Sequence, residues 1–306
     1  MDRSRSPTTT LTYPTFSAGT RAIRATGPED ALRAAGFNDR PVGYSPLGVG
    51  VKSAVWQVNF DLSESLAWKV YNRSGVAARE QAAYRLLGEH SLALPRMAVG
   101  VEADEVFEFG WTLMTVAPGE ALSRRLGELT RETVLGVYRS AGAFLAELHE
   151  YGRERFDNRA QISERFERAL LRFDPGLAGQ IRTMLERAPL EGCEFSALCH
   201  GDLHAENLRV DDAGAFVGAL DLESSRRGDP TFDIVRTCHS LHPYDERVLD
   251  ALIEGYGGEP PGFTDVFDLY FILCELKLWN YFAAGESEAP LESIETRIAQ
   301  RVSVHG

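Results

Sequence analysis

The sequence has few cysteines and no long apolar run. Its four cysteines form no closely spaced pair, which fits a reducing cytoplasm better than a disulfide framework; they are Cys193, Cys199, Cys238 and Cys274. No apolar stretch approaches the roughly 20 residues that a membrane-spanning helix needs. We therefore expect a cytoplasmic protein with no membrane partner.

Positive charge is also scarce. The chain has 32 Lys and Arg residues against 45 Asp and Glu, a formal net charge of −13. A nucleic-acid binder would need a basic face, so this class is not expected. A composition of 44% hydrophobic and 25% charged residues is typical of a globular protein, here one large domain or two lobes. Residues 1–26 are rich in Ser, Thr and Arg and lack the apolar core of a secretory signal, so we expect a flexible N-terminal extension.

Polar residues of chemical interest gather in one stretch, from Cys199 to Glu223. It contains His200, Asp202, His204, Asn207 and Asp221. Apolar alternation around 208–210, a turn at 211–214 and an apolar run at 215–220 predict a hairpin. Because a hairpin brings its open ends together, we expect Asp202, Asn207 and Asp221 to converge.

Three oxygen-bearing side chains at one point favour a magnesium and phosphate site, since Mg²⁺ prefers a few hard oxygen ligands. The spacing favours the same chemistry. Asp202 is followed five residues later by Asn207, and Asp221 lies beyond the hairpin. This order is typical of kinases, in which one residue orients the attacking hydroxyl and two bind metal.

The first half of the chain is rich in predicted strands. Residues 44–60 read as a strand, a glycine turn and a strand, in which backbone could approach phosphate closely at Gly48, Gly50 and Ser53. Taken alone, such a segment is more often a plain structural turn. The next strand, 66–71, carries Lys69, a charge that needs a partner if buried. A helix predicted at 76–89 offers Glu80 as that partner.

Two further strands are predicted at 97–101 and 106–116, the second interrupted by Gly110. Beyond Pro118 the pattern changes to amphipathic helices, at 131–151, 160–172 and 176–188. We therefore expect an α+β, bilobal molecule with a cleft between its lobes. The expected domains are a nucleotide-binding N-lobe, 27–118, and a helical C-lobe with the catalytic loop and acceptor site, 119–306.

From about Tyr44 onward the chain resembles the aminoglycoside phosphotransferase and choline kinase family of small-molecule kinases. His200-Gly-Asp-Leu-His-Ala-Glu-Asn is similar to the family's catalytic loop, and Leu220-Asp-Leu-Glu to its metal-binding segment. Arg79-Glu-Gln-Ala-Ala-Tyr-Arg-Leu-Leu resembles the helix that supplies the partner of the lysine. Leu113-Met-Thr-Val-Ala-Pro-Gly resembles the hinge over which adenine lies. Ala205 and Glu206 stand where Pro-Gly is frequent, and Ala54 where Asn often follows the serine of the glycine loop.

The resemblance implies a protein-kinase-like fold and an O-phosphotransferase that uses ATP or GTP with Mg²⁺. It implies that Asp202 is the catalytic base and that Asn207 and Asp221 bind the metal. Nucleotide contacts would come from the glycine loop, the lysine pair and the hinge backbone, that is, from Gly48, Gly50, Ser53, Lys69, Glu80, Thr115, Val116 and Ala117. The acceptor would be a hydroxyl-bearing small molecule, and the protein a monomer or homodimer.

Two other classes remain open. His200 and His204, with Cys199 and Asp202 nearby, could belong to a metal-dependent hydrolase, although this leaves Asn207 without a role. A pseudokinase that only binds nucleotide would not need the base. We expect His200 to be structural and neutral, and His204 to contact either phosphate or protein. By resemblance Asp233 braces the catalytic loop, while Asp229 reads as a helix N-cap and His149 as a satisfied core residue.

The acceptor's charge is predicted from the last fifth of the chain. From Leu241 to Gly306 there are twelve Asp and Glu against four Lys and Arg. The usual explanation of such an excess of acidic residues is a solvated acidic surface, since runs of charge usually face water. However, residues 265–282 predict a largely buried helix with Asp268 and Glu275 among aromatics such as Trp279. By resemblance this region binds the acceptor, so we predict a cationic one, such as an aminoglycoside, with a role in antibiotic resistance; a metabolite kinase is the alternative.

Overall fold

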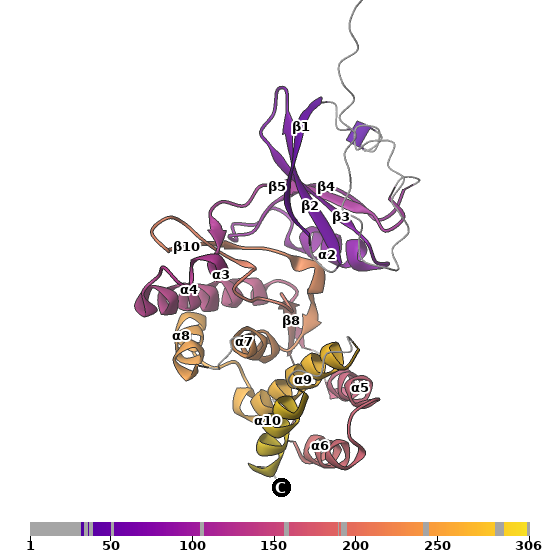
Figure 1. Ribbon diagram of the computed structural model, residues 1–306, viewed down its shortest axis with the longest axis vertical. Helices are drawn as coiled ribbons and strands as arrows, with labels where there is room; N and C mark the ends of the chain where they lie inside the picture. Colours follow the sequence, from indigo (N-terminus) through magenta and orange to yellow (C-terminus); the bar gives the residue numbers. More distant parts are fainter. Residues whose placement is uncertain are drawn as a thin grey trace, which may run out of the picture. The chain divides into compact units, whose positions relative to one another are not determined.

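The computed structural model describes residues 32, 33, 36, 39–49, 52–104, 107–155, 159–188, 190, 195–240, 245–284 and 291–304. The predicted extension 1–26 and Gly50 lie outside these residues. The chain divides into two compact units. Unit 1 is Met1–Tyr84 with Pro95–Val116, and unit 2 is Arg85–Leu94 with Ala117–Gly306 (Figure 1).

Unit 1 contains a five-stranded antiparallel sheet, with strand order β1-β2-β3-β5-β4. The strands are β1 (Pro41–Val49), β2 (Ser53–Phe60), β3 (Leu66–Tyr71), β4 (Met97–Val101) and β5 (Trp111–Thr115). Helix α2 (Val76–Leu87) follows β3. Trp68 is buried and packs edge-on against Trp111 and Phe107, which anchors the core beneath the central strands.

The last strand of unit 1 is shorter than the predicted 106–116. It begins only after Gly110, whose φ of 79° is a left-handed conformation. The Gly110 N–H bonds to the Phe107 carbonyl, and a Cβ at Gly110 would lie 2.3 Å from the carbonyl oxygens of Val101 and Glu102. A turn that only glycine fits therefore precedes β5, so the predicted interruption at Gly110 is confirmed, and β5 is only the part of the predicted strand that follows it.

Unit 2 is mainly helical, as predicted. Its helices are α3 (Leu122–Arg125), α4 (Arg131–Glu150), α5 (Arg159–Leu170), α6 (Pro175–Arg187), α7 (Pro230–His239), α8 (Glu246–Tyr256), α9 (Phe263–Ala284) and α10 (Leu291–Val304). Among the described residues no helix is long and apolar enough to cross a membrane.

Two small sheets accompany these helices, with strand orders β10-β9-β6 and β11-β8-β7. Their strands are β6 (Glu120–Ala121), β7 (Glu154–Arg155), β8 (Phe195–Cys199), β9 (Leu208–Val210), β10 (Phe216–Ala219) and β11 (Arg226–Gly228). Strands β9 and β10 form the predicted hairpin, with Leu208 opposite Ala219. The segment between β8 and β9 is the stretch that carries the candidate site.

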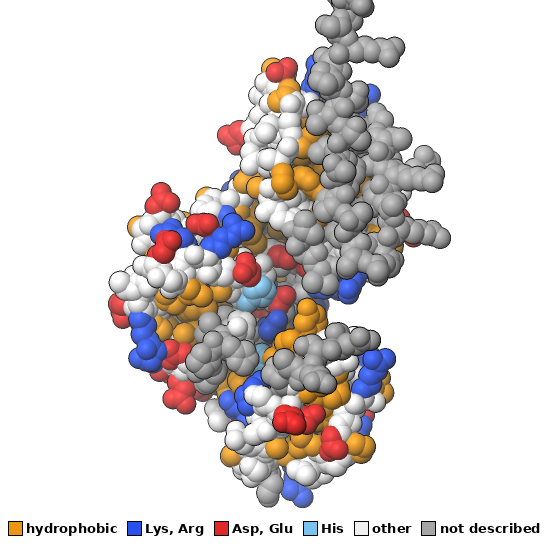
Figure 2. Space-filling model, in the orientation of Figure 1, with side chains coloured by type: hydrophobic (Ala, Val, Ile, Leu, Met, Phe, Trp, Pro, Cys, Tyr) orange, Lys and Arg blue, Asp and Glu red, His pale blue; other side chains and the backbone are white. Residues whose placement is uncertain are grey.

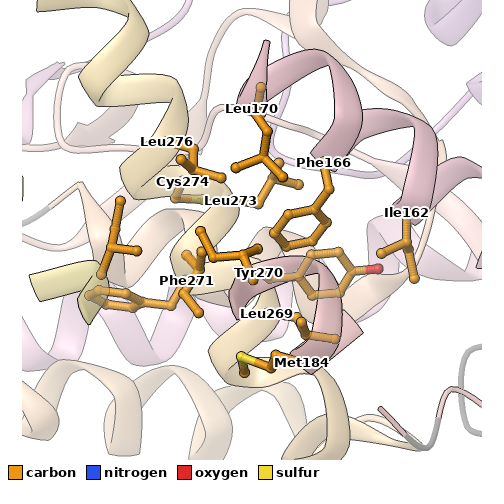
Figure 3. Packing of buried hydrophobic residues seen from close by; sticks show 14 of the residues in the cluster. Ile162, Phe166, Leu170, Met184, Leu269, Tyr270, Phe271, Leu273, Cys274 and Leu276 are labelled. Atoms are coloured by element: carbon orange, nitrogen blue, oxygen red, sulfur yellow. The ribbon is translucent and has the colours of Figure 1, made fainter. Parts of the chain in front are cut away.

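Helix α9 lies at the centre of the largest core. Its side chains Tyr270, Leu273 and Cys274 pack beside Phe166 and Leu170 of α5 (Figure 3). Every side chain of α9 from Leu269 to Leu276 is buried. A helix that is apolar on nearly all sides is expected to be enclosed by other elements, and α7, α5 and α10 all contact α9.

Candidate active site

The hairpin brings the three predicted oxygen-bearing residues together within unit 2. The Leu220 N–H donates to the Asn207 carbonyl over 2.8 Å, so Asn207 and Asp221 flank the open end of the hairpin. The Asn207 side-chain amide donates to the Asp202 carbonyl over 2.9 Å. This bond turns the amide nitrogen toward the loop and leaves the Asn207 Oδ1 for a ligand.

A buried carboxylate fixes the loop that precedes Asp202. Asp233 of α7 accepts the backbone N–H groups of His200 over 2.6 Å and Gly201 over 2.7 Å. It also lies 3.1 Å from the Nε2 of His149, whose Nδ1 is 3.0 Å from the Tyr256 hydroxyl. Burial opposes ionisation of Asp233, but the bonds from His149 and Gly201 outweigh it and lower its pKa. The expected brace is thus present, and His149 is a satisfied core residue.

The His200 ring forms hydrogen bonds with the backbone through both of its nitrogens. The Asp202 N–H donates to its Nδ1 over 3.4 Å, so Nε2 carries the proton and donates to the Leu220 carbonyl over 2.9 Å. Burial lowers the pKa of His200, so the neutral ring persists in the fold. Both ring nitrogens are occupied, which confirms the structural role and removes a ligand from the hydrolase alternative. His204 remains near the site, with its Nε2 3.8 Å from the Asp202 Oδ2.

Among the described residues, the closest charged partner of the Asp202 side chain is Arg236. The Arg236 Nη2 lies 2.6 Å from the Asp202 Oδ1, and both side chains are partly exposed. Sequence reasoning missed this arginine. The available signal was its spacing, because Arg236 stands three residues after Asp233 on α7, and residues three apart share a helix face.

Asp221 has the only positive φ, 73°, of any non-glycine residue that the structure describes. Its Oδ1 accepts the Glu223 N–H over 3.1 Å and caps the short 3₁₀ turn Leu222–Ser224. Such a conformation is strained and is typical of functional sites, where the surrounding structure enforces it. The Asp221 carboxylate and the Asn207 Oδ1 are hard oxygen donors, so this pair fits Mg²⁺.

Unit 1 contains the predicted lysine pair. The Lys69 Nζ lies 2.8 Å from the Glu80 Oε2, and both side chains are buried. The Tyr71 hydroxyl donates to the same Glu80 oxygen over 2.7 Å and lies 2.9 Å from the Thr112 Oγ1. Burial and then the Glu80 charge raise the pKa of Tyr71 well above its ordinary value, so it stays a donor. The ion pair itself is confirmed.

Of the residues predicted to contact the nucleotide, the structure describes those of the glycine turn, except Gly50, and those of the hinge. Gly48 lies in β1 opposite Val55, where a Cβ would meet no atom within 4 Å, and Ser53 is buried at the start of β2. Thr115 ends β5, where its N–H donates to the Arg96 carbonyl over 3.0 Å. The nucleotide roles of Gly48, Ser53, Thr115, Val116 and Ala117 stay predictions.

The three predicted acceptor residues have partners within the chain. Glu275 accepts two bonds from Arg297 of α10, over 2.7 and 2.8 Å, and Asp268 pairs with Arg301 of the same helix. The Trp279 Nε1 donates to the Glu295 Oε1 over 2.9 Å. The argument that these acids need a cationic acceptor was therefore wrong, because arginines of α10 pair with both of them.

A strand-rich unit with a buried lysine–glutamate pair and a helical unit with the Asp202 loop are the features of a phosphotransferase with a protein-kinase-like fold. Comparisons with known proteins give the same class. A model of the phosphotransferase enzyme family matches residues 43–266, which is most of the chain. The protein therefore belongs to this family of small-molecule kinases, which act on an alcohol group. No curated protein matches the sequence significantly.

Solved structures show the same fold at low identity. One is a putative aminoglycoside phosphotransferase from Ralstonia eutropha JMP134, 14% identical, with a TM-score of 0.63 over 90% of this chain and 94% of that one. Another is the macrolide 2′-phosphotransferase MphH from Brachybacterium faecium, 20% identical, TM-score 0.57, covering 87% and 94%. A third is APH(2″)-IIa in complex with streptomycin and ATP, 15% identical, TM-score 0.63, covering 90% and 97%.

Proposed function

We propose that the protein transfers the γ-phosphate of ATP or GTP to a hydroxyl of a small molecule in the cytoplasm. The observation that carries this proposal is the arrangement of Asp202, Asn207 and Asp221 around one braced loop. In the reaction the hydroxyl oxygen forms a bond to the γ-phosphorus while the bond from that phosphorus to the β–γ bridging oxygen breaks. Asp202 orients the hydroxyl and accepts its proton.

Other residues bind and orient the nucleotide in this proposal. Lys69, fixed by Glu80, contacts the α- and β-phosphates, and the turn with Gly48, Gly50 and Ser53 covers them. The backbone of Thr115–Ala117 meets the purine. Asn207 and Asp221 would hold Mg²⁺, which neutralises phosphate charge when bound.

Two observations bear on the chemical identity of the acceptor. Neighbours of the same fold include a macrolide 2′-phosphotransferase and APH(2″)-IIa in complex with streptomycin and ATP, which favours an antibiotic and a resistance role. The internal arginine partners of Asp268 and Glu275 remove the support that these residues gave to a cationic acceptor. A metabolite kinase is the second candidate, because the active-site residues serve either acceptor equally.

A nucleotide-consumption screen of the purified protein tests the proposal. It should include aminoglycosides, macrolides, hydroxy acids and sugar phosphates with ATP or GTP. For the acceptor that turns over, Asp202→Ala should lower kcat by ~10² to 10⁴, the usual contribution of a general base. Asp212→Ala is the matched control, because this exposed Asp lies on the hairpin turn. An Asp202→Ala enzyme within about tenfold of wild type would show that the base is wrong.

The pseudokinase alternative has its own signature. A pseudokinase would be protected by nucleotide against heating but would consume none with any acceptor. Asp221→Ala should abolish the magnesium-dependent part of this protection. Protection that is unchanged in the variant would contradict the metal assignment.

A further inference from the structure

Three cationic side chains from three separate elements of unit 2 surround one aromatic ring. The ring is Phe232 of α7, which is buried. The Arg165 Cζ of α5 lies 4.2 Å from its centroid, the Arg226 Cζ of β11 lies 4.3 Å from it, and the Lys277 Nζ of α9 lies 4.8 Å from it. We call Arg165, Arg226 and Lys277 the cation cluster. One ring attracts each cation weakly and cannot offset the repulsion among three.

No described carboxylate forms an ion pair with a member of the cation cluster. Arg226 donates from Nη1 to the Ser224 carbonyl over 3.3 Å, but the buried Nη2 atoms of Arg165 and Arg226 have no acceptor among the described residues. On the face shown in Figure 2, by contrast, acidic side chains lie among the basic ones. Buried donors without acceptors destabilise a fold, so the cation cluster needs a functional explanation.

The like charges also change how the cluster binds protons. Burial and then Arg226 lower the pKa of Arg165 to about 10. Burial and then the charges of Arg165 and Arg226 lower the pKa of Lys277 to about 7. The Lys277 residue is nevertheless exposed to solvent as a whole, so its side chain is not enclosed in the core. A ligand could therefore reach this group.

The cation cluster is next to the catalytic loop. Arg226 stands opposite Cys199 in the β11–β8 pair, and Cys199 directly precedes His200. Arg236 adds to the positive field at Lys277 and lies 2.6 Å from the Asp202 Oδ1. The charge of Arg236 thus acts on both Lys277 and the proposed base, within unit 2 alone.

We propose that the cation cluster binds a carboxylate or phosphate group of the acceptor, so that the substrate is an anionic hydroxy compound. Its negative group would supply the acceptors that the Arg165 and Arg226 guanidinium groups lack, and its hydroxyl would face Asp202. This inference rests on the proposed phosphotransferase function and specifies its acceptor. It replaces the cationic acceptor, whose predicted ligands Asp268 and Glu275 are paired with arginines of α10.

The first experiment measures anion binding without turnover. The chain has three lysines, Lys52, Lys69 and Lys277, so ¹³C-methylation gives few lysine NMR signals to assign. Inorganic phosphate, compared with chloride at equal ionic strength, should raise the pKa of Lys277 by about one unit, because a bound anion favours the ammonium. Arg165→Gln should abolish this response. Lys69→Met should keep it, which excludes the nucleotide site, and so should Arg168→Gln, an exposed arginine of α5.

The second experiment distinguishes an acceptor group from free phosphate. Hydroxy acids are compared with their amides, and sugar phosphates with the free sugars. Turnover should be restricted to the anionic member of a pair, and Arg165→Gln should raise its KM about tenfold while the nucleotide KM stays unchanged. If Arg165→Gln does not fold, Lys277→Gln takes its place and should also raise the KM for the anionic acceptor.

The outcomes separate the two proposals. A Lys277 signal that does not respond to phosphate would overturn the anion site and leave the kinase assignment standing. Turnover of neutral or cationic acceptors, with a KM indifferent to Arg165→Gln, would overturn the acceptor role even if phosphate binds. Absence of turnover with every acceptor, although Lys277 responds, would overturn the phosphotransferase proposal and the acceptor role together.

Discussion

Arg236 donates a hydrogen bond from Nη2 to Oδ1 of Asp202 over 2.6 Å, which ties the proposed base to helix α7. Since the same helix carries Asp233, which binds the loop backbone, both the position of Asp202 and the direction of its carboxylate depend on α7. This pairing leaves Oδ2 as the oxygen that can meet an acceptor hydroxyl. Arg236 is therefore a positioning residue.

Substitution of Arg236 should lower kcat with little change in the nucleotide KM. We expect a loss of roughly tenfold or more in Arg236→Gln, less than for loss of the base itself. Arg236→Lys keeps the charge and should recover part of the rate. Steady-state kinetics with both variants checks this, and a lysine variant as slow as the glutamine variant in a correctly folded protein would contradict a charge-based positioning role.

Removing one partner of the Lys69–Glu80 pair should destabilise the fold. Both side chains are buried, so Glu80→Gln leaves a buried ammonium without its counter-charge. We expect the free energy of unfolding to fall by about 3 to 5 kcal/mol, measured by urea denaturation. The exposed pair Arg168–Glu164 provides the control, because Arg168→Gln should cost less than about 1 kcal/mol. Equal stability of Glu80→Gln and wild type would show that the pair contributes nothing to the fold.

Asp233 should contribute stability that is lost in acid. Its pKa is lowered in the fold from an ordinary 3.8, so around and below pH 4 the unfolded chain binds the proton more readily. The stabilisation is complete above the unfolded pKa and disappears as the pH falls through the folded value. Asp233→Asn should remove this part of the acid dependence and should already be less stable at pH 7, since its amide nitrogen cannot accept a backbone N–H. Unfolding at a series of pH values tests this, with Asp212→Asn expected to behave like wild type.

The parts of the site that sequence could predict are those set by short-range pattern. The hairpin follows from alternation and a turn, and Asp229 caps α7 through its bond to the Thr231 N–H, as its position before Pro230 predicts. The partner of Lys69 was predictable because a buried charge on a strand needs one, and Glu80 was the acid on the following helix.

The remaining parts depend on long-range packing. Arg165, Arg226 and Lys277 are separated by 112 positions from first to last and meet only because α5, β11 and α9 contact α7 or its neighbours. The count of charges along the chain showed an acidic C-terminal fifth, from which a cationic acceptor was predicted. It could not show that α10 neutralises α9, which requires the packed helices.

Glu275 should therefore matter for stability and not for acceptor binding. Burial opposes its ionisation, but His239, whose Nε2 lies 3.4 Å from the Glu275 Oε1, and the hydrogen bonds from Arg297 lower the pKa of Glu275 to about 2. Glu275→Gln should lower the melting temperature while the acceptor KM stays within about twofold of wild type, because the partners of Glu275 are His239 of α7 and Arg297 of α10. Glu292→Gln on the exposed face of α10 is the control for stability. A selective rise in the acceptor KM would restore Glu275 to the acceptor site.

Lys277 should weaken the fold in a pH-dependent way when no anion is bound. Burial and then the charges of Arg165, Arg226 and Arg236 lower its pKa from 10.5 to about 7 in the fold, so the charged form is disfavoured there. Below about pH 7 both states are charged and the full penalty applies. Between about pH 7 and 10.5 only the unfolded state keeps its proton, so stability rises with pH.

Lys277→Met should accordingly be more stable than wild type at pH 6.5, with an advantage that shrinks toward pH 10. Thermal unfolding in chloride buffers measures the difference. Inorganic phosphate should narrow it at pH 6.5, because an anion bound to the cation cluster stabilises the wild-type ammonium and has less to bind in the variant. An advantage that is independent of pH would mean that lost methylene packing, rather than charge, governs position 277. One that is independent of phosphate would mean that no anion binds beside Lys277.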